Sequence, residues 1–228
     1  MIDDTALSRH SHRLPPPTWD AVLVAGGHGR RAGGPKALAM RDGRLMWRWQ
    51  VAAMRAAGCG TIAAVLHPMA MPASNVAEAL AHVRCVEADA DAEMIASLQL
   101  GLRALARAQP DGRNAGPTRP VFMLPVDCPC PGAPVFAALG RAAVALELQS
   151  QPWQVVRPWV DTSSGRRRGH PVVLGPALIG AVVSLDARTG RLDRLISALP
   201  ETQRIDVQVK DERICGNFNY GGLGTYET

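Results

Sequence analysis

The sequence predicts a single α/β domain with a mostly parallel central sheet. Short apolar runs rich in β-branched residues alternate with longer amphipathic segments, which is the pattern of strands connected by crossover helices. The chain has 228 residues, of which 47% are hydrophobic and 20% are charged, so it can bury one sizeable core. We expect the domain to cover residues 19–228, preceded by a flexible leader over residues 1–18.

The strands are predicted from short apolar runs that end near glycine, proline or polar residues. In chain order, these runs cover residues 21–25, 61–66, 83–86, 121–126, 154–160, 171–174 and 205–209. The run at 121–126 is apolar throughout, as expected for a strand that is covered on both faces of its sheet.

Two helices are predicted from apolar residues that recur with a helical period. Residues 44–57 place one apolar face at Leu45, Trp49, Ala52, Ala53 and Ala56. Residues 92–108 repeat the pattern at Ile95, Leu98, Leu102 and Leu105. Residues 109–120 are rich in glycine, proline and asparagine and predict a loop, whereas residues 157–169 predict a long hairpin that leaves the sheet.

Charge and apolar patterning exclude several classes of protein. The chain has 25 Lys and Arg against 20 Asp and Glu, and this net charge of +5 favours phosphorylated ligands but is too small for nucleic-acid packaging. No apolar run is long enough to cross a membrane, and the first residues lack a secretory core, so a cytoplasmic protein is expected. The five cysteines contain no C-x-x-C pair and are expected to be reduced thiols.

A glycine-rich loop follows the first predicted strand directly. Residues 26–36 contain five glycines, two arginines and one lysine, so backbone N–H groups and cationic side chains can together surround phosphate oxygens. A Walker A loop is excluded because Lys36 is followed by Ala37 and not by serine or threonine. A dinucleotide-binding fingerprint is disfavoured because Gly33, Gly34 and Pro35 block the helix that should follow it at once.

A single carboxylate, Asp127, follows the predicted strand at 121–126. The carboxyl ends of parallel strands meet at one edge of the sheet, so Asp127 is expected beside the glycine-rich loop. A carboxylate opposite Arg31 and Lys36 is well placed to hold Mg²⁺, which binds one or two protein carboxylates together with substrate phosphates and water.

Five segments together resemble the molybdenum-cofactor nucleotidyltransferases, the family of molybdopterin cytidylyl- and guanylyltransferases. The most specific is Val24-Ala-Gly-Gly-His-Gly-Arg-Arg-Ala-Gly-Gly-Pro-Lys36, which resembles the family's phosphate-binding signature. Residues 122–129 are similar to the segment whose aspartate binds the metal. Weaker similarities at residues 93–101, 165–174 and 217–219 extend the resemblance over nearly the whole chain.

The resemblance implies a three-layer, Rossmann-like fold of the nucleotide-diphospho-sugar transferase type, with a nucleotide-binding part at about 19–130 and an acceptor-binding part at about 131–228. It implies Mg²⁺-dependent transfer of CMP or GMP from CTP or GTP to molybdopterin, with release of pyrophosphate. It assigns catalytic roles to Arg31, Lys36 and Asp127. It assigns nucleotide binding to Ala25, Gly26, Gly27, Gly29, Arg31, Gly33, Lys36 and Ser97. It assigns acceptor binding to Arg167, Gly169 and His170, and the metal to Asp127 and Asn219.

The sequence leaves the donor base and the acceptor open. Residues 25–27 and 217–219 favour the guanylyl-transferring branch, whereas residues 168–172 favour the cytidylyl-transferring one. Ala32 and Glu93 replace the family's usual methionine and glycine, and the terminal element lacks its carboxylate. The alternatives are a nucleotidyltransferase for a sugar phosphate, methylerythritol phosphate or phospholactate, and a non-catalytic nucleotide- or cofactor-binding protein. A molybdoenzyme or its chaperone is a candidate partner, and neither nucleic acid nor a membrane is expected as one.

Overall fold

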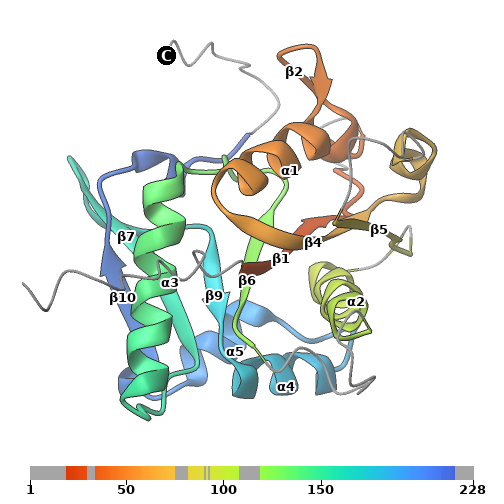
Figure 1. Ribbon diagram of the computed structural model, residues 1–228. Coiled ribbons are helices and arrows are strands. Elements are labelled where there is room, and N and C mark those ends of the chain that lie inside the picture. The colour runs from red at the N-terminus through yellow and green to blue at the C-terminus, as the bar shows by residue number, and fades with distance from the viewer. Residues whose placement is uncertain are drawn as a thin grey trace, which may run out of the picture.

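The computed structural model describes residues 19–29, 34–74, 82–89, 91, 93–107 and 119–218 (Figure 1). The strands are β1 (Trp19–Ala25), β2 (Met40–Arg41), β3 (Arg44–Leu45), β4 (Cys59–Leu66), β5 (Val83–Glu87), β6 (Val121–Pro125), β7 (Val155–Thr162), β8 (Gly165–Arg168), β9 (Val172–Leu174) and β10 (Arg204–Gln208). The α-helices are α1 (Met46–Ala56), α2 (Met94–Ala106), α3 (Ala133–Leu148), α4 (Pro176–Ser184) and α5 (Leu192–Ala198). The 3-10 helices are η2 (Lys36–Leu38), η3 (Pro68–Ser74), η5 (Glu201–Gln203) and η6 (Glu212–Cys215).

Eight strands form the central sheet in the order β10-β7-β9-β6-β1-β4-β5, with β8 paired to β7. Four of the strand pairs are parallel: β1 with β4, β1 with β6, β4 with β5, and β7 with β10. Only β8 and β9 run antiparallel to their neighbours in this sheet. The predicted mostly parallel sheet is therefore confirmed, and β2 and β3 form a separate small hairpin.

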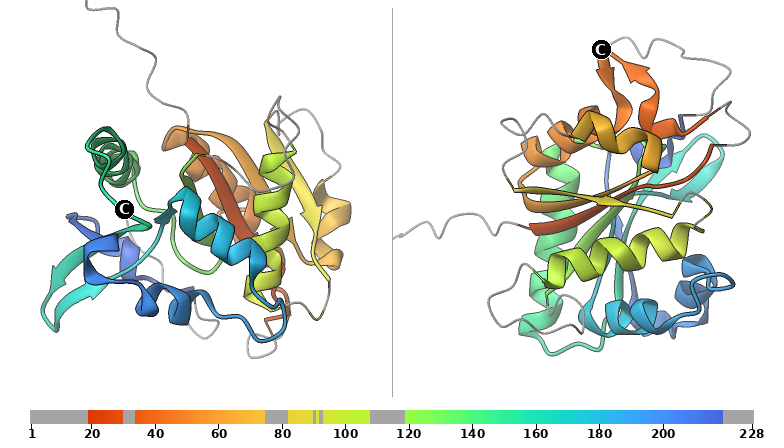
Figure 2. Two further views of the ribbon diagram at one scale, coloured as in Figure 1. Left: turned by 90° about the horizontal axis from the view of Figure 1, so that it is seen from below. Right: turned by 90° about the vertical axis from the view of Figure 1, so that its right-hand side faces the viewer.

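Helices cover both faces of the sheet, which gives the molecule three layers. β1 is buried on both sides: Leu23 packs into the cluster that includes α1 and α3, and Val22 packs into the cluster that includes α2, α4 and α5. Figure 2 shows α1 and α2 on opposite sides of the strands. Among the described residues, no helix is long and apolar enough to cross a membrane.

The predicted apolar face of the first helix is wrong. Leu45 precedes α1, Trp49 and Ala53 are only partly buried, and Ala52 and Ala56 are exposed. The buried positions are instead Met46, Trp47, Gln50, Val51 and Met54. The alanines mislead the pattern because they count as apolar yet bury little surface, so the larger side chains decide which face turns inward. The predicted face of the second helix, at Ile95, Leu98, Leu102 and Leu105, is confirmed.

Three helices and the β2–β3 hairpin do not appear among the predicted elements. α3 is rich in alanine, so its polar and apolar faces contrast little, and α4 is apolar in most of its nine residues. The predicted hairpin near residues 157–169 is present as β7 and β8. The five cysteines all lie among the described residues, and none is paired in a disulfide.

Candidate active site

The glycine-rich loop begins where β1 ends and returns to the same edge of the sheet. The amide of Gly34 donates a hydrogen bond to the carbonyl of Gly29 at 3.3 Å, which closes the loop at its base. Gly29 has φ +58°, and a side chain there would collide with the carbonyl of Gly34, so only glycine fits. Arg31 and Gly33, two of the predicted phosphate-binding residues, lie outside the described residues.

The start of this loop packs against the first turn of α2. A Cβ atom on Gly26 would lie 2.7 Å from Ser97 Oγ and 2.6 Å from Ala88 Cβ, so glycine permits this close approach. Ser97 is only 1% exposed, and Ala25, at the end of β1, is buried in the core cluster on the α1 side of the sheet. A Cβ atom on Gly27 would meet nothing within 4 Å. The structure therefore brings Gly26 and Ser97 together and leaves open space beside Gly27.

Lys36 and Asp127 form an ion pair at this edge of the sheet. Lys36 is the first residue of η2, just after the glycine-rich loop, and Asp127 lies in the turn after β6. Lys36 Nζ donates to Asp127 Oδ2 at 2.7 Å, and the two side chains are 22% and 27% exposed. The fold thus joins two residues that are 91 positions apart in the chain and that the sequence predicted for one site.

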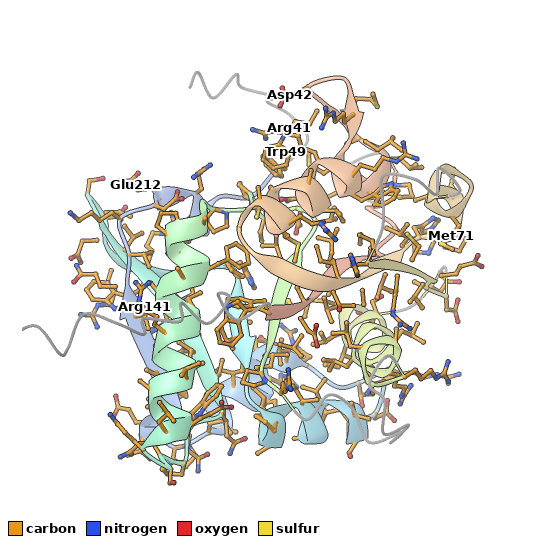
Figure 3. The ribbon with its side chains drawn as sticks, in the orientation of Figure 1. Arg41, Asp42, Trp49, Met71, Arg141 and Glu212 are labelled. Atoms are coloured by element: carbon orange, nitrogen blue, oxygen red, sulfur yellow. The ribbon has the colours of Figure 1, made fainter. Side chains whose placement is uncertain are left out.

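The last described segment of the chain also reaches Asp127. The amide of Phe218 donates to the carbonyl of Asp127 at 2.7 Å. The Arg41 guanidinium lies 4.3 Å from the Trp49 ring and 4.6 Å from the Phe218 ring, so a cation–π contact fastens this segment to α1. Figure 3 shows Arg41 beside Trp49. Asn219, the predicted second metal ligand, lies outside the described residues.

The three arginines of β8 have different surroundings. Arg168 pairs with Asp206 at 2.7 Å, and Arg166 stacks over the Trp159 ring at 3.8 Å. Alternate strand residues face opposite sides, so Arg167 points to the other face, where its charge acts on Cys215 of η6. No side-chain hydrogen bond or ion pair within the described part of the chain engages the guanidinium of Arg167. Arg167 is thus the arginine of β8 that neither pairs with a carboxylate, as Arg168 does, nor stacks on a ring, as Arg166 does, within the described residues.

The other predicted acceptor residues lie between β8 and β9. A side chain on Gly169 would collide with the carbonyl of Ile214, and the amide of His170 donates to that carbonyl at 2.9 Å. The peptide bond between His170 and Pro171 is cis. Burial lowers the pKa of His170 from its ordinary value, while the negative charge of Asp127 acts in the opposite direction. The structure therefore places His170 within electrostatic reach of Asp127.

Comparison with known families agrees with this geometry. The pattern of the MobA-like NTP transferase domain matches residues 21–204, which include the glycine-rich loop, Lys36, Asp127 and the β7–β8 hairpin. The chain belongs to the MobA-like NTP transferase domain family. It is a nucleotidyltransferase, as expected from the sequence. A search of curated proteins finds no significant match.

Solved structures share the fold of this MobA-like domain at low sequence identity. Rv0371c of Mycobacterium tuberculosis matches with a TM-score of 0.60 and 19% identity, over 85% of this chain and 90% of that one. The 4-diphosphocytidyl-2C-methyl-D-erythritol synthase of Anaerococcus prevotii matches with a TM-score of 0.63 and 14% identity, over 88% and 90%. The 2-C-methyl-D-erythritol 4-phosphate cytidylyltransferase of Thermus thermophilus matches with 0.56 and 18%, over 88% and 92%. These matches confirm the predicted three-layer fold.

The side chains of this MobA-like site suit a metal ion that is also bound by the phosphates of a nucleotide. Within the described ranges, no group of three or more histidine, cysteine or acidic side chains could hold a metal ion. Asp127 offers one carboxylate, and it already holds the Lys36 ammonium as a cation at 2.7 Å. Mg²⁺ keeps several waters and needs one or two protein carboxylates when phosphates supply other ligands. A related structure, Rv0371c, has been solved as a complex with manganese.

Sequence reasoning missed a polar chain that runs beside the glycine-rich loop. His67 directly follows β4, and its Nδ1 accepts from the amide of Met69 at 3.2 Å, so its proton lies on Nε2. His67 Nε2 then lies 3.4 Å from His28 Nδ1, and His28 Nε2 lies 3.0 Å from Asp91 Oδ1. The signal was available, because His28 and His67 follow adjacent parallel strands and so reach the same edge of the sheet.

Two histidines of this MobA-like domain, His67 and His170, predict a loss of stability in mild acid. Burial lowers the pKa of His67, with His28 adding to the effect, and burial also lowers the pKa of His170, both from 6.5. Just below pH 6.5 the unfolded chain therefore binds more protons than the folded one. The free energy of unfolding is unaffected by these histidines above that pH and falls as the pH decreases below it. We expect the Tm to fall between about pH 7.5 and 5.5, and to fall less in His67→Gln. Thermal denaturation of both proteins checks this, and equal losses would contradict the role of His67.

Proposed function

We propose that this nucleotidyltransferase transfers CMP from CTP, or GMP from GTP, to molybdopterin or its molybdenum-loaded form, with release of pyrophosphate. The observation that carries the proposal is the Lys36–Asp127 pair beside the glycine-rich loop, at the edge where parallel strands end. A phosphate-binding cation next to a metal-binding carboxylate is what nucleotidyl transfer requires of a protein.

The roles of the residues follow from the charges that develop. Lys36 and Arg31 clamp the triphosphate, and the backbone amides of residues 26–34 surround it. An acceptor phosphate oxygen forms a bond to the α-phosphorus, and the bond from that phosphorus to pyrophosphate breaks. No general base is needed because the acceptor phosphate is already an anion. Asp127 and Asn219 would hold Mg²⁺, which neutralises charge on the phosphates when bound.

The nucleotide-binding and acceptor-binding parts meet at Asp127. We place donor binding in residues 19–130, with Ala25, Gly26, Gly27, Gly29 and Ser97 at the loop and the helix that faces it. We place acceptor binding in residues 131–228, where Gly169 and His170 pack on η6. Arg167 faces the same side as η6, so its guanidinium suits the phosphate of a pterin acceptor.

Pyrophosphate release tests the reaction and the acceptor together. The purified protein is incubated with Mg²⁺, CTP or GTP, and one acceptor at a time: molybdopterin, methylerythritol phosphate, a sugar phosphate or phospholactate. We expect turnover with molybdopterin and with one of the two nucleotides. Methylerythritol phosphate is the principal alternative, because two of the solved structures with this fold are named as enzymes of that acceptor. Turnover with it alone would replace the proposed acceptor and keep the reaction.

Arg167 provides a test of the acceptor side alone. We expect Arg167→Ala to raise the KM for the acceptor about 10-fold, because one charge-assisted contact to a phosphate is lost. The KM for the nucleotide should stay unchanged. Arg166→Ala is the matched control, since Arg166 stacks on Trp159 on the opposite face of β8. Equal effects of the two variants on the acceptor KM would refute the assignment of Arg167.

A further inference from the structure

Gln50 is a polar residue on the buried face of α1. Its side chain is 0% exposed, and the other buried residues of that face, among them Trp47, Val51 and Met54, are apolar. A primary amide in such a place costs free energy unless its donor and acceptor atoms are hydrogen-bonded. The partners of Gln50 therefore show what this position stabilises.

Among the described residues, all the hydrogen bonds of the Gln50 side chain go to the turn that carries Asp127. Nε2 donates to the carbonyl of Val126 at 2.9 Å and to the carbonyl of Cys128 at 2.6 Å. Oε1 accepts from the amide of Cys130 at 3.0 Å. These partners flank Asp127 on both sides, so one amide group spans the turn from end to end.

This turn has few backbone donors of its own. Pro125, Pro129 and Pro131 have no N–H group, so the turn depends on other segments for hydrogen bonds to its carbonyls. The helix supplies two of these through Gln50, and the amide of Phe218 supplies a third, to the carbonyl of Asp127 itself. With its backbone held from both directions, Asp127 directs its carboxylate toward Lys36.

We propose that Gln50 is a positioning residue for the metal-binding carboxylate: it fixes the turn at residues 126–130 so that Asp127 can bind a divalent cation together with the phosphates. The proposal rests on the proposed function, because it assigns Asp127 to the metal. Gln50 acts through the backbone and touches neither the metal nor the substrate. Loss of a partner that orients a metal ligand in this way typically costs about 10- to 100-fold in metal affinity or activity.

A second buried glutamine separates positioning from plain stability. Gln99 of α2 is 3% exposed, and its Nε2 donates to the carbonyls of Val182 and Leu185 at 2.9 and 2.8 Å. Gln50→Met and Gln99→Met each remove a buried amide that bonds two backbone carbonyls, so both variants should lose several degrees of Tm. Only the first change touches the turn that holds Asp127.

The experiment measures Mn²⁺ binding by electron paramagnetic resonance, in the full chain, without nucleotide and with CTP or GTP. We expect Gln50→Met to weaken Mn²⁺ binding about 10- to 100-fold and Gln99→Met to leave it within about two-fold of the wild type. Gln50→Glu keeps the length and the acceptor oxygen of the side chain, so it answers the question if Gln50→Met does not fold. The metal concentration for half-maximal pyrophosphate release should rise in parallel.

The outcomes distinguish the two proposals. Wild-type Mn²⁺ affinity in folded Gln50→Met or Gln50→Glu would overturn the positioning role, as would equal weakening in Gln99→Met. If Asp127→Asn binds Mn²⁺ as tightly as the wild type, Asp127 does not bind the metal, and the positioning role of Gln50 is overturned as well. Mn²⁺ binding that depends on both Asp127 and Gln50, without pyrophosphate release by the wild type on any acceptor, would refute the proposed function and leave the positioning role intact.

Discussion

Asp127→Ala is expected to lower the rate of pyrophosphate release by about 10³-fold or more, with the fold intact. Asp127 supplies the one described carboxylate that faces Lys36, so its loss removes the charge that would hold the metal against the phosphates. The ion pair itself is partly exposed to solvent, so its removal should cost only about 1 kcal/mol of folding stability. Large loss of turnover with small loss of stability is therefore the expected combination.

The measurement compares turnover and thermal denaturation in three proteins. The wild type and Asp127→Ala are measured with Glu147→Gln, which removes a carboxylate near the carboxyl end of α3. α3 begins at Ala133, just after the Asp127 turn, so Glu147 lies about 20 Å farther along the helix axis. We expect the control to keep full turnover. Substantial turnover by Asp127→Ala would remove Asp127 from the catalytic machinery.

The sequence predicted the part of the site that depends on strand order. Strands β1 and β6 are short, apolar and recognisable, and their parallel pairing brings whatever follows them to one edge. The glycine-rich loop and Asp127 are the residues that follow them. Their proximity could therefore be inferred without knowing the path of the chain between them, and the 2.7 Å ion pair agrees with that inference.

The residues that support the Asp127 turn could not be predicted from the sequence. Their contacts depend on which face of α1 turns inward and on where the last described segment of the chain packs. Gln50 is polar and did not belong to the predicted apolar face of the helix, and only the packed structure shows its amide on the Asp127 turn. The contact of Arg41 with Phe218 joins segments far apart in the chain, and no periodic signal connects them. The three successive arginines of β8 look alike in the sequence, and only the strand register separates Arg167 from its neighbours.

Lys36→Met is expected to lower kcat/KM for the nucleotide by about 10²- to 10³-fold. Lys36 lies at the end of the glycine-rich loop, and its ammonium group contacts the carboxylate of Asp127. From this position the ammonium group can move to a bound triphosphate. The loss should appear in both nucleotide affinity and turnover, because charge on the phosphates grows as pyrophosphate departs. Arg44→Met, on the exposed part of the β2–β3 hairpin, is the control for removal of one positive charge.

The same variant should bind Mn²⁺ more tightly when no nucleotide is present. In the structure the Lys36 ammonium holds Asp127 at 2.7 Å, so an incoming metal ion must displace it. Removing that competitor should raise the metal affinity by up to about five-fold, the equivalent of roughly 1 kcal/mol for a partly exposed pair. Nucleotide and metal should bind cooperatively in the wild type, since phosphates draw Lys36 away and release the carboxylate, and the cooperativity should be smaller in Lys36→Met, where only the direct bonds between metal and phosphates remain. Titrating Mn²⁺ with and without CTP or GTP measures this coupling, and weaker metal binding by Lys36→Met alone would show that Lys36 supports the carboxylate instead of competing for it.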